Sequence, residues 1–172
     1  MPADMSPKYV FCQMGSAVIA GIAKGAGMIE PNMATMLVYL MTDAELPSST
    51  MRPMLRRIVD RTFNCMSIDT DTSTSDTVVL MANGLAGKVN LQHFEDALSH
   101  VCEFLTREIA RNGEGATKLI IVDVTGSQSG AQAKSIAKSI VNSPLVKTAV
   151  YGCDPNWGRV IMAIGKSFDT AI

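Results

Sequence analysis

The feature that most constrains this chain is a long amphipathic pattern that begins at residue 91. Apolar side chains recur there at intervals of three or four residues, at Leu91, Phe94, Leu98, Val101, Cys102, Leu105 and Ile109. This spacing places them on one face of a helix. The pair Asn112-Gly113 is typical of a helix end. The pattern therefore predicts one long amphipathic helix over residues 91–112, and the fold must accommodate it beside any strands.

Short strand-like segments surround this helix. Residues 35–41 are continuously apolar, which favours a strand buried on both faces. Residues 9–29 combine apolar side chains with glycine and alanine, which predicts one or two strands with a bend at residues 24–27. The remaining segments predict strands at 77–82 (ended by a turn at Asn83-Gly84), 118–124 and 144–151, and helices at 130–141 and 156–164. This mixture predicts an α/β (α+β mixed) fold.

Composition excludes several classes of protein. The 172 residues are 47% hydrophobic and 18% charged, which is too apolar for a disordered chain. The net charge of -1 and an aromatic fraction of 5% give no overall case for nucleic-acid binding. No apolar run reaches the roughly 18 residues of a membrane span, and the N-terminus lacks the pattern of a secretory signal. The four cysteines form no CxxC pair, which predicts reduced thiols, buried or inert, in a cytosol-like compartment.

A second helix is predicted after Leu46-Pro47, with Ser48 or Ser49 as its cap. Its apolar positions are Met54, Leu55, Ile58, Val59 and Phe63, and its outward positions are Arg52, Arg56, Arg57 and Arg61. The four arginines could form a phosphate-binding patch, but a solvated helix face is the favoured interpretation. His93 and His100 lie seven residues apart, too far along a helix to share a metal ion.

Residues 67–76 are dense in hydroxyl and carboxylate groups. They resemble a calcium loop only superficially, because the central glycine and terminal glutamate of such a loop are missing. The segment is either a turn whose side chains satisfy backbone groups or a polar wall that faces a substrate. Both interpretations stay open, and no metal site is predicted anywhere in the chain.

The segment that points most clearly to chemistry spans residues 21–37. It places Lys24 among glycines and then follows Pro31-Asn32 with Ala34-Thr35. A threonine hydroxyl needs a base to act as a nucleophile. If the chain were cut before Thr35, the new α-amino group, with a pKa near 8, could take the hydroxyl proton. Small neighbours in a tight turn would let the hydroxyl reach the preceding carbonyl for an N→O acyl shift.

The whole segment, GIAKGAGMIEPNMATMLVYLMTDA, resembles the cleavage motif of the ornithine acetyltransferase family, the bifunctional glutamate N-acetyltransferases of arginine biosynthesis. Three later blocks resemble the same family in the same order. They are the hydroxyl-rich block at residues 63–84, NGEGATK at 112–118, and SPLVKTA with YGCDPNWGR at 143–159. The resemblance covers nearly the whole chain.

This resemblance implies an α/β architecture in which a strand sandwich is flanked by helices. It implies that self-cleavage divides one precursor into two chains, which then form a hetero-oligomer. Residues 1–172 would make up a single partial domain of such an enzyme. Residues 1–34 would be the tail of the first chain and residues 35–172 the main part of the second.

The resemblance also implies the reaction. Thr35 would be the catalytic nucleophile and Ala34–Thr35 the cleaved bond. Thr35 would take an acetyl group from N-acetylornithine and pass it to glutamate, with Lys24 and Glu114 binding these substrates. Some members also use acetyl-CoA as the acetyl donor, and no metal or prosthetic group is implied. The expected location is the cytoplasm, or the mitochondrial matrix in a eukaryote.

The sequence departs from the family pattern in places. The family's oxyanion pair, Thr-Gly, falls upstream of the first residue here, and Pro2 and Ala3 stand where the family has two threonines. Glu30 stands where the family usually has histidine. Two alternatives therefore stay open. One is a catalytically inactive fragment or degenerate paralogue that lacks the oxyanion hole, and the other is a related self-processing aminopeptidase.

Overall fold

The computed structural model describes residues 6–25, 36–70 and 75–168 of the chain. The chain divides into two compact units, Met1–Gly115 and Ala116–Ile172, and each is described by itself. No helix in the described ranges is long and apolar enough to cross a membrane.

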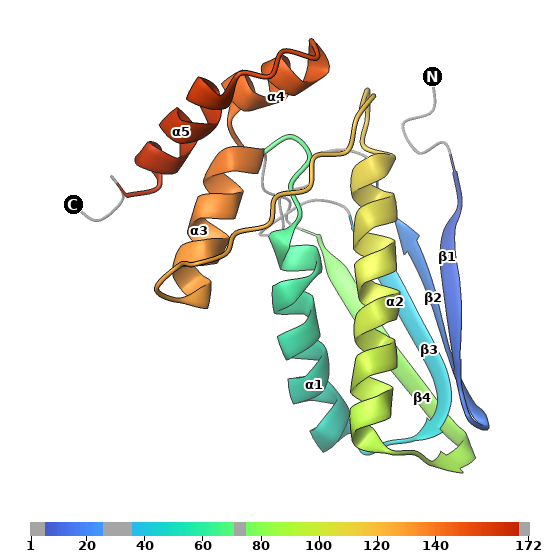
Figure 1. Ribbon diagram of the computed structural model, residues 1–172. Helices are drawn as coiled ribbons and strands as arrows, with labels where there is room; N and C mark the ends of the chain where they lie inside the picture. Colours follow the sequence, from blue (N-terminus) through green and yellow to red (C-terminus); the bar gives the residue numbers. More distant parts are fainter. Residues whose placement is uncertain (1–5, 26–35, 71–74, 169–172) are drawn as a thin grey trace. The chain divides into compact units, whose positions relative to one another are not determined.

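The first unit is built on a four-stranded sheet with the order β1-β2-β3-β4 (Figure 1). The strands are β1 (Lys8–Met14), β2 (Ala17–Lys24), β3 (Leu37–Glu45) and β4 (Thr77–Lys88). The pairs β1–β2 and β2–β3 are antiparallel, whereas β4 runs parallel to β3. A parallel pair needs a crossover connection, and here the crossover contains helix α1 (Ser48–Arg61) and the short 3-10 helix η1 (Phe63–Cys65).

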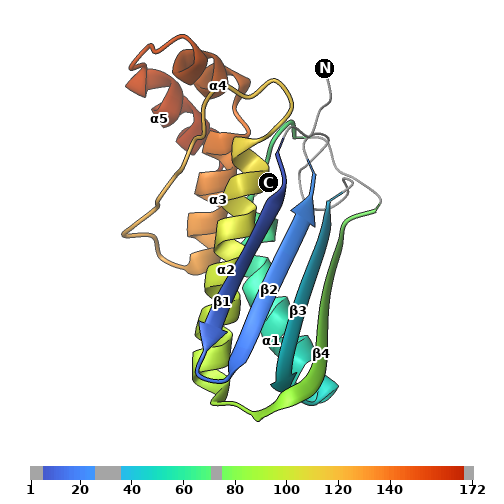
Figure 2. The same ribbon diagram turned by 90° about the vertical axis from the view of Figure 1, so that its right-hand side faces the viewer.

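Helix α2 (Leu91–Arg111) lies with α1 on one face of this sheet (Figures 1 and 2). Its apolar face is buried from Phe94 to Ile109, as the 3.6-residue spacing predicts, whereas Leu91 in the first turn is half-exposed. The core between the helices and the sheet includes the buried side chains of Ile19, Val38, Leu40, Ile58, Phe63, Phe94, Leu98, Val101 and Leu105. The amphipathic pattern of residues 91–112 thus covers one face of the sheet.

Gly21 in the middle of β2 allows α2 to approach the sheet closely. A Cβ atom built at this position would lie 2.8 Å from Leu105 Cδ1 and 2.9 Å from Val101 Cγ1. Those distances are shorter than ordinary carbon–carbon contact. The missing side chain of Gly21 is therefore part of the packing between α2 and the sheet.

The opposite face of the sheet carries exposed apolar side chains within the described ranges. Tyr39 and Met41 on β3 are exposed, while Val38 and Leu40 between them are fully buried. This alternation is that of a strand with one covered face. The prediction that residues 35–41 are buried on both faces is therefore wrong for the described part of this strand, because both helices of the first unit pack on the same side.

The described part of the second unit, up to residue 168, contains three helices, α3 (Gly130–Val141), α4 (Pro144–Tyr151) and α5 (Trp157–Lys166). Their small core is formed by Ile140, Val146 and Ala163, with partly buried apolar neighbours that include Val122. Side-chain oxygens of Ser129, Ser143 and Asn156 cap the three helix starts by accepting from backbone N–H groups.

The predicted fold class is confirmed, and so are most of its elements. The strand predicted at 77–82 is the first half of β4, and the helices predicted at 130–141 and 156–164 are α3 and α5. Residues 9–29 contain a hairpin, β1 and β2, whose turn is at Gly15-Ser16, where Gly15 has φ +59°. Positive φ suits glycine because it lacks a Cβ atom.

Four local predictions are wrong. Residues 144–151 form helix α4 rather than a strand, and residues 118–124 form no regular element. The cap of α1 is Pro47, with no side-chain hydrogen bond, rather than Ser48 or Ser49. Asn83-Gly84 does not end its strand. Instead β4 continues to Lys88 through an irregularity in its pairing with β3.

We predict that Gly21→Ala lowers the free energy of unfolding of the first unit by about 1–3 kcal/mol, the usual cost of overpacking a core. The reason is the conflict of the new methyl group with Leu105 and Val101. Denaturant unfolding measures the effect. In the double variant Gly21→Ala/Leu105→Ala, the loss should be smaller than the sum of the two single losses, because the nearest conflicting atom is gone. Strictly additive losses would contradict this account of the helix–sheet contact.

Candidate functional site

The described residues that flank the candidate nucleophile gather at one end of the sheet. β1, β3 and β4 begin at this end, and β2 and helix α2 finish there (Figure 2). Two antiparallel pairings and one parallel pairing bring the four strand ends together. We call this region the upper end of the sheet.

Three strands place one row of residues across the upper end. Lys24, the last residue of β2, pairs with Leu37, and Leu37 pairs with Thr77 at the start of β4. Neighbouring strands lie about 4.8 Å apart, so the backbone of Lys24 is roughly two strand spacings from that of Thr77. The side chain of Lys24 is exposed. Its ammonium group is therefore available to a ligand at this end of the sheet.

Glu114 reaches the upper end from the other layer. It follows helix α2 directly, in a turn, and its side chain is exposed. The end of α2 is fixed beside β1, because the Ser6 hydroxyl donates to Asn112 Oδ1 at 2.7 Å. Gly113 also fits closely against Ile68, where an added Cβ would lie 3.0 Å from Ile68 Cγ2. The structure therefore brings Lys24 and Glu114 to the same end of the first unit.

Ala34 and Thr35, the predicted cleavage site, lie outside the described residues. The first described residue after them is Met36, which is buried. Its backbone is held from both sides by the start of β4. The N–H of Met36 donates to Asp76 Oδ1 at 2.7 Å, and the N–H of Thr77 donates to the Met36 carbonyl at 2.8 Å. The N–H and the carbonyl of Met36 are thus each fixed by one hydrogen bond.

Asp76 is the most unusual titratable group among the described residues at this end. Its second oxygen, Oδ2, is buried and has no hydrogen-bond partner in the described part of the chain. Burial raises the pKa of the Asp76 carboxyl above its ordinary value of 3.8, against the opposing effect of the hydrogen bond from Met36. A buried acceptor without a donor is costly, which makes Asp76 a candidate functional residue.

The hydroxyl-rich segment is described at residues 67–70 and 75–76. Asp76 accepts a hydrogen bond from a backbone N–H, that of Met36. This is the structural role expected of a turn whose side chains satisfy backbone groups. Ser67 Oγ is buried without a hydrogen-bond partner among the described residues. Thr70 has φ +71°, a left-handed conformation that a β-branched residue rarely adopts. Strained backbone and unpartnered buried polar atoms are often found at functional sites. They favour the second interpretation, a polar wall that faces a substrate.

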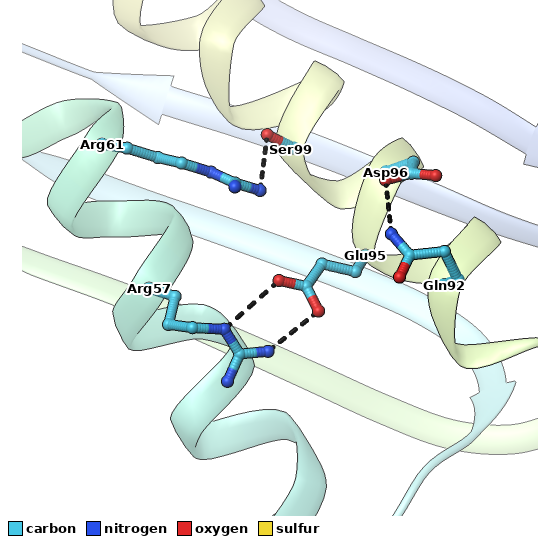
Figure 3. Close-up of polar contacts among 6 residues, drawn as sticks. All are labelled: Arg57, Arg61, Gln92, Glu95, Asp96 and Ser99. Carbon is cyan, nitrogen blue, oxygen red and sulfur yellow. Dashed lines mark hydrogen bonds and ion pairs between the residues drawn. The ribbon is translucent and has the colours of Figure 1, made fainter.

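The arginine-rich face of α1 is exposed, as predicted for a solvated helix face. Arg57 forms an ion pair with Glu95 on α2, with 2.8 Å between Arg57 Nη2 and Glu95 Oε2 (Figure 3). Arg61 donates to the Ser99 hydroxyl one turn further along, as the same figure shows. Two of the four arginines therefore hold the two helices together.

The other candidate groups have no clear catalytic arrangement. His93 and His100 are exposed on α2, and the described residues contain no cluster of three or more His, Cys, Asp or Glu side chains that could hold a metal. All four cysteines are free. Burial, with a smaller contribution from Glu103, raises the pKa of the Cys102 thiol to about 12, which fits the prediction of an inert thiol. Cys65 and Cys153 are exposed.

Sequence reasoning missed two residues of the upper end. Asp76 was grouped with the hydroxyl-rich block, although its place directly before an apolar strand is a signal that a carboxylate could accept from a strand N–H. Lys8 was not singled out, yet this lysine at the start of β1 is only 3% exposed. A buried lysine is uncommon, and Lys8 pairs with Ala23, the residue before Lys24 in β2.

Comparison with known proteins decides the family. The model of the ArgJ family matches residues 1–171. This chain belongs to the ArgJ family. Its members among the curated relatives include a glutamate N-acetyltransferase (Oat2) of Streptomyces clavuligerus, 59% identical over 169 residues. Another is the arginine biosynthesis bifunctional protein ArgJ of Thermus thermophilus, 48% identical over 167 residues.

A solved member of the ArgJ family has a similar structure. It is the crystal structure of the arginine biosynthesis bifunctional protein ArgJ of Bacillus halodurans, with a TM-score of 0.73 and 48% sequence identity. The match covers 75% of this chain and 64% of that chain. The family resemblance noted from the motifs is therefore confirmed by sequence and by fold.

The chain spans less than half the length of its curated relatives. The two relatives named above match it over 98% and 97% of its own length, but over 43% and 44% of theirs. The division at residues 34 and 35 into tail and main part stays a prediction.

We predict that Asp76→Asn changes thermal stability in a pH-dependent way. Because the folded pKa of Asp76 lies above 3.8, folding takes up a proton at this group, and stability falls as the pH rises from 3.8 through the raised pKa. Asparagine keeps an acceptor for the Met36 N–H but cannot ionise. The Tm of the variant minus that of the wild type should therefore be more positive at pH 7 than at pH 3. An unchanged or reversed difference would contradict the account of Asp76.

Proposed function

We propose that the protein carrying this chain transfers an acetyl group from N-acetylornithine to glutamate through an acetyl-threonine at Thr35. The observation that carries the proposal is the gathering of Lys24, Glu114 and Met36, the residue next to Thr35, at the upper end of the sheet. Family membership supports it, since relatives of this chain are named as a glutamate N-acetyltransferase and as arginine biosynthesis bifunctional proteins.

The proposed reaction begins with self-cleavage. The Thr35 hydroxyl attacks the carbonyl of Ala34, and the peptide nitrogen leaves as the α-amine of Thr35 while the acyl group moves to oxygen. Water then hydrolyses this ester. The cut chain begins with Thr35, whose α-amine has a pKa near 8 in model compounds and is partly neutral at pH 7. It can therefore serve as the base for its own hydroxyl.

Acetyl transfer follows in two half-reactions. The Thr35 oxygen attacks the acetyl carbonyl of N-acetylornithine, its proton passes to the α-amine, and ornithine leaves with that proton. The amino group of glutamate then attacks the acetyl-threonine and restores the free hydroxyl. Acetyl-CoA would serve as an alternative donor in the first half-reaction. No metal or prosthetic group takes part in either.

Lys24 and Glu114 suit these substrates by charge. Both substrates are amino acids or acylated amino acids, with a carboxylate that an ammonium group can bind. Glu114 offers a carboxylate to a substrate amino group, and charge-assisted hydrogen bonds of both kinds are stronger than neutral ones. We further propose that the cleaved pieces stay together as a hetero-oligomer and that the enzyme works in the cytoplasm.

We predict that the purified protein consists of two pieces separated between Ala34 and Thr35. Thr35→Ala should give a single uncut chain, because it removes the attacking hydroxyl. Thr35→Ser, which keeps a hydroxyl, should still be cut. Intact-mass spectrometry distinguishes the three. An uncut wild type after prolonged incubation would overturn the proposed nucleophile.

We predict that Lys24→Met and Glu114→Gln each raise the KM for an amino-acid substrate about 10- to 100-fold, the loss of one hydrogen bond to a charged group. Transfer of acetyl from N-acetylornithine to glutamate measures this. Lys88→Met and Glu108→Gln are matched controls, since Lys88 lies at the far end of β4 and Glu108 pairs with Arg111 on the surface of α2. Release of amino acids from small peptides, without transfer, would instead favour an aminopeptidase.

A further inference from the structure

Lys118 and Cys153 form a close pair of nucleophilic side chains in the second unit. The Nζ atom of Lys118 lies 2.6 Å from Cys153 Sγ, although the two residues are 35 positions apart in the chain. Ordinary N–H···O hydrogen bonds measure about 2.7–3.2 Å, and sulfur is a larger atom than oxygen. The contact is therefore shorter than an ordinary hydrogen bond from nitrogen to sulfur.

The lysine is held in this position by the end of helix α4. Its Nζ atom donates to the carbonyl of Val150 at 2.7 Å and to that of Tyr151 at 3.2 Å. A lysine at a helix C-terminus commonly satisfies the last carbonyls in this way. The Val150 carbonyl also accepts the backbone N–H of Cys153 at 3.2 Å. One carbonyl thus binds both members of the pair and keeps the nitrogen beside the cysteine.

This capping role explains Lys118 but does not explain the sulfur atom. Cys153 has φ +56°, a left-handed conformation that is uncommon for a residue with a side chain and that glycine adopts freely. The thiol group is therefore present at a position where a side chain adds backbone strain. Both Lys118 and Cys153 are exposed in the second unit, so a small oxidant in solution can reach the sulfur.

We propose that Lys118 and Cys153 are a redox-sensitive modification site, at which a peroxide joins the two side chains through a reversible sulfur–nitrogen bond. The oxidised form of cysteine, a sulfenic acid, condenses with a nearby nitrogen. Reaction is favoured when the reacting atoms are held about 3–3.5 Å apart, and the nitrogen and sulfur here are already closer than that. The proposal is independent of the proposed acetyl transfer.

The reaction uses one equivalent of hydrogen peroxide. The thiolate of Cys153 attacks one peroxide oxygen, and the O–O bond breaks. The hydroxide that leaves takes a proton from the Lys118 ammonium group, which gives water, a neutral amine and a sulfenic acid. The amine nitrogen then attacks the sulfur, the S–O bond breaks, and the hydroxyl group leaves as water with a proton from the amine. Sulfur loses two electrons, and peroxide is reduced to water.

Reduction by a thiol restores the pair. One molecule of an added thiol attacks the linked sulfur and releases the Lys118 amine, and a second molecule releases the Cys153 thiol. The reagent leaves as its own disulfide. The link would therefore join the segment of Lys118 to the end of α4 covalently under oxidising conditions only.

The test is peptide mapping by mass spectrometry of the whole protein after treatment with hydrogen peroxide and digestion without reductant. The expected product joins the peptides that contain Lys118 and Cys153, at a mass about 2 Da below their sum, because two hydrogens are lost. Dithiothreitol should separate the two peptides again. Cys65 is an internal control, since it is also exposed but its thiol donates to the Asp60 carbonyl. It should gain oxygen without a link to a lysine.

Lys118→Arg is the matched variant. Arginine can still donate to the carbonyls at the end of α4, but it stays protonated and is not a nucleophilic amine. The link should be lost, and Cys153 should be oxidised to a sulfinic acid, about 32 Da heavier.

Three results would overturn the proposal. One is a treated wild type whose two peptides stay separate while Cys153 carries added oxygen. Another is a linked pair of any other mass, and the third is a link that persists in Lys118→Arg. The map of the wild type decides the proposal even if the variant fails to fold.

Discussion

The close contact between helix α2 and strand β2 is the constraint on which the first unit depends. Gly21 removes a side chain at the point where Leu105 and Val101 reach the sheet. This lets one apolar helix face cover the sheet and leaves little empty volume, as close packing requires. The helix direction is then fixed, so its last turn lies where β1 begins and β2 finishes. The contact between α2 and the sheet thus determines which residues lie together at the upper end of the sheet.

The parallel pairing of β3 with β4 places a carboxylate, that of Asp76, at the upper end of the sheet. Two strands that begin side by side place unpaired N–H groups next to each other, and a side chain must satisfy one of them. Here Asp76, directly before β4, accepts from Met36, directly before β3. A hairpin between these strands would have put their starts at opposite ends. The crossover through α1 therefore brings a carboxylate to the residue that follows the proposed nucleophile.

The spacing of apolar residues along the chain predicts the long helices correctly. It fails for segments whose structure depends on contacts with residues far away in the sequence. Helices α2, α3 and α5 were found because their apolar spacing is sustained. The eight residues 144–151 are mostly apolar and too short to separate a strand from a helix, so their composition predicts a strand, although Ser143-Pro144 is a good helix start. Residues 118–124 have the composition of a strand, but the described sheet offers them no partner. Lys24 and Glu114 came from family motifs, whereas the bond from Met36 to Asp76 joins residues 40 positions apart, which spacing along the chain cannot predict.

Asp76 carries a buried oxygen that has no donor in the described part of the chain, and this destabilises the fold. The hydrogen bond from the Met36 N–H favours the charged carboxylate, but burial has the larger effect and raises the pKa of Asp76. An asparagine would accept from the same N–H without a charge to bury. A carboxylate that persists at a cost in stability is a feature of functional sites, and this one lies where β3 and β4 begin.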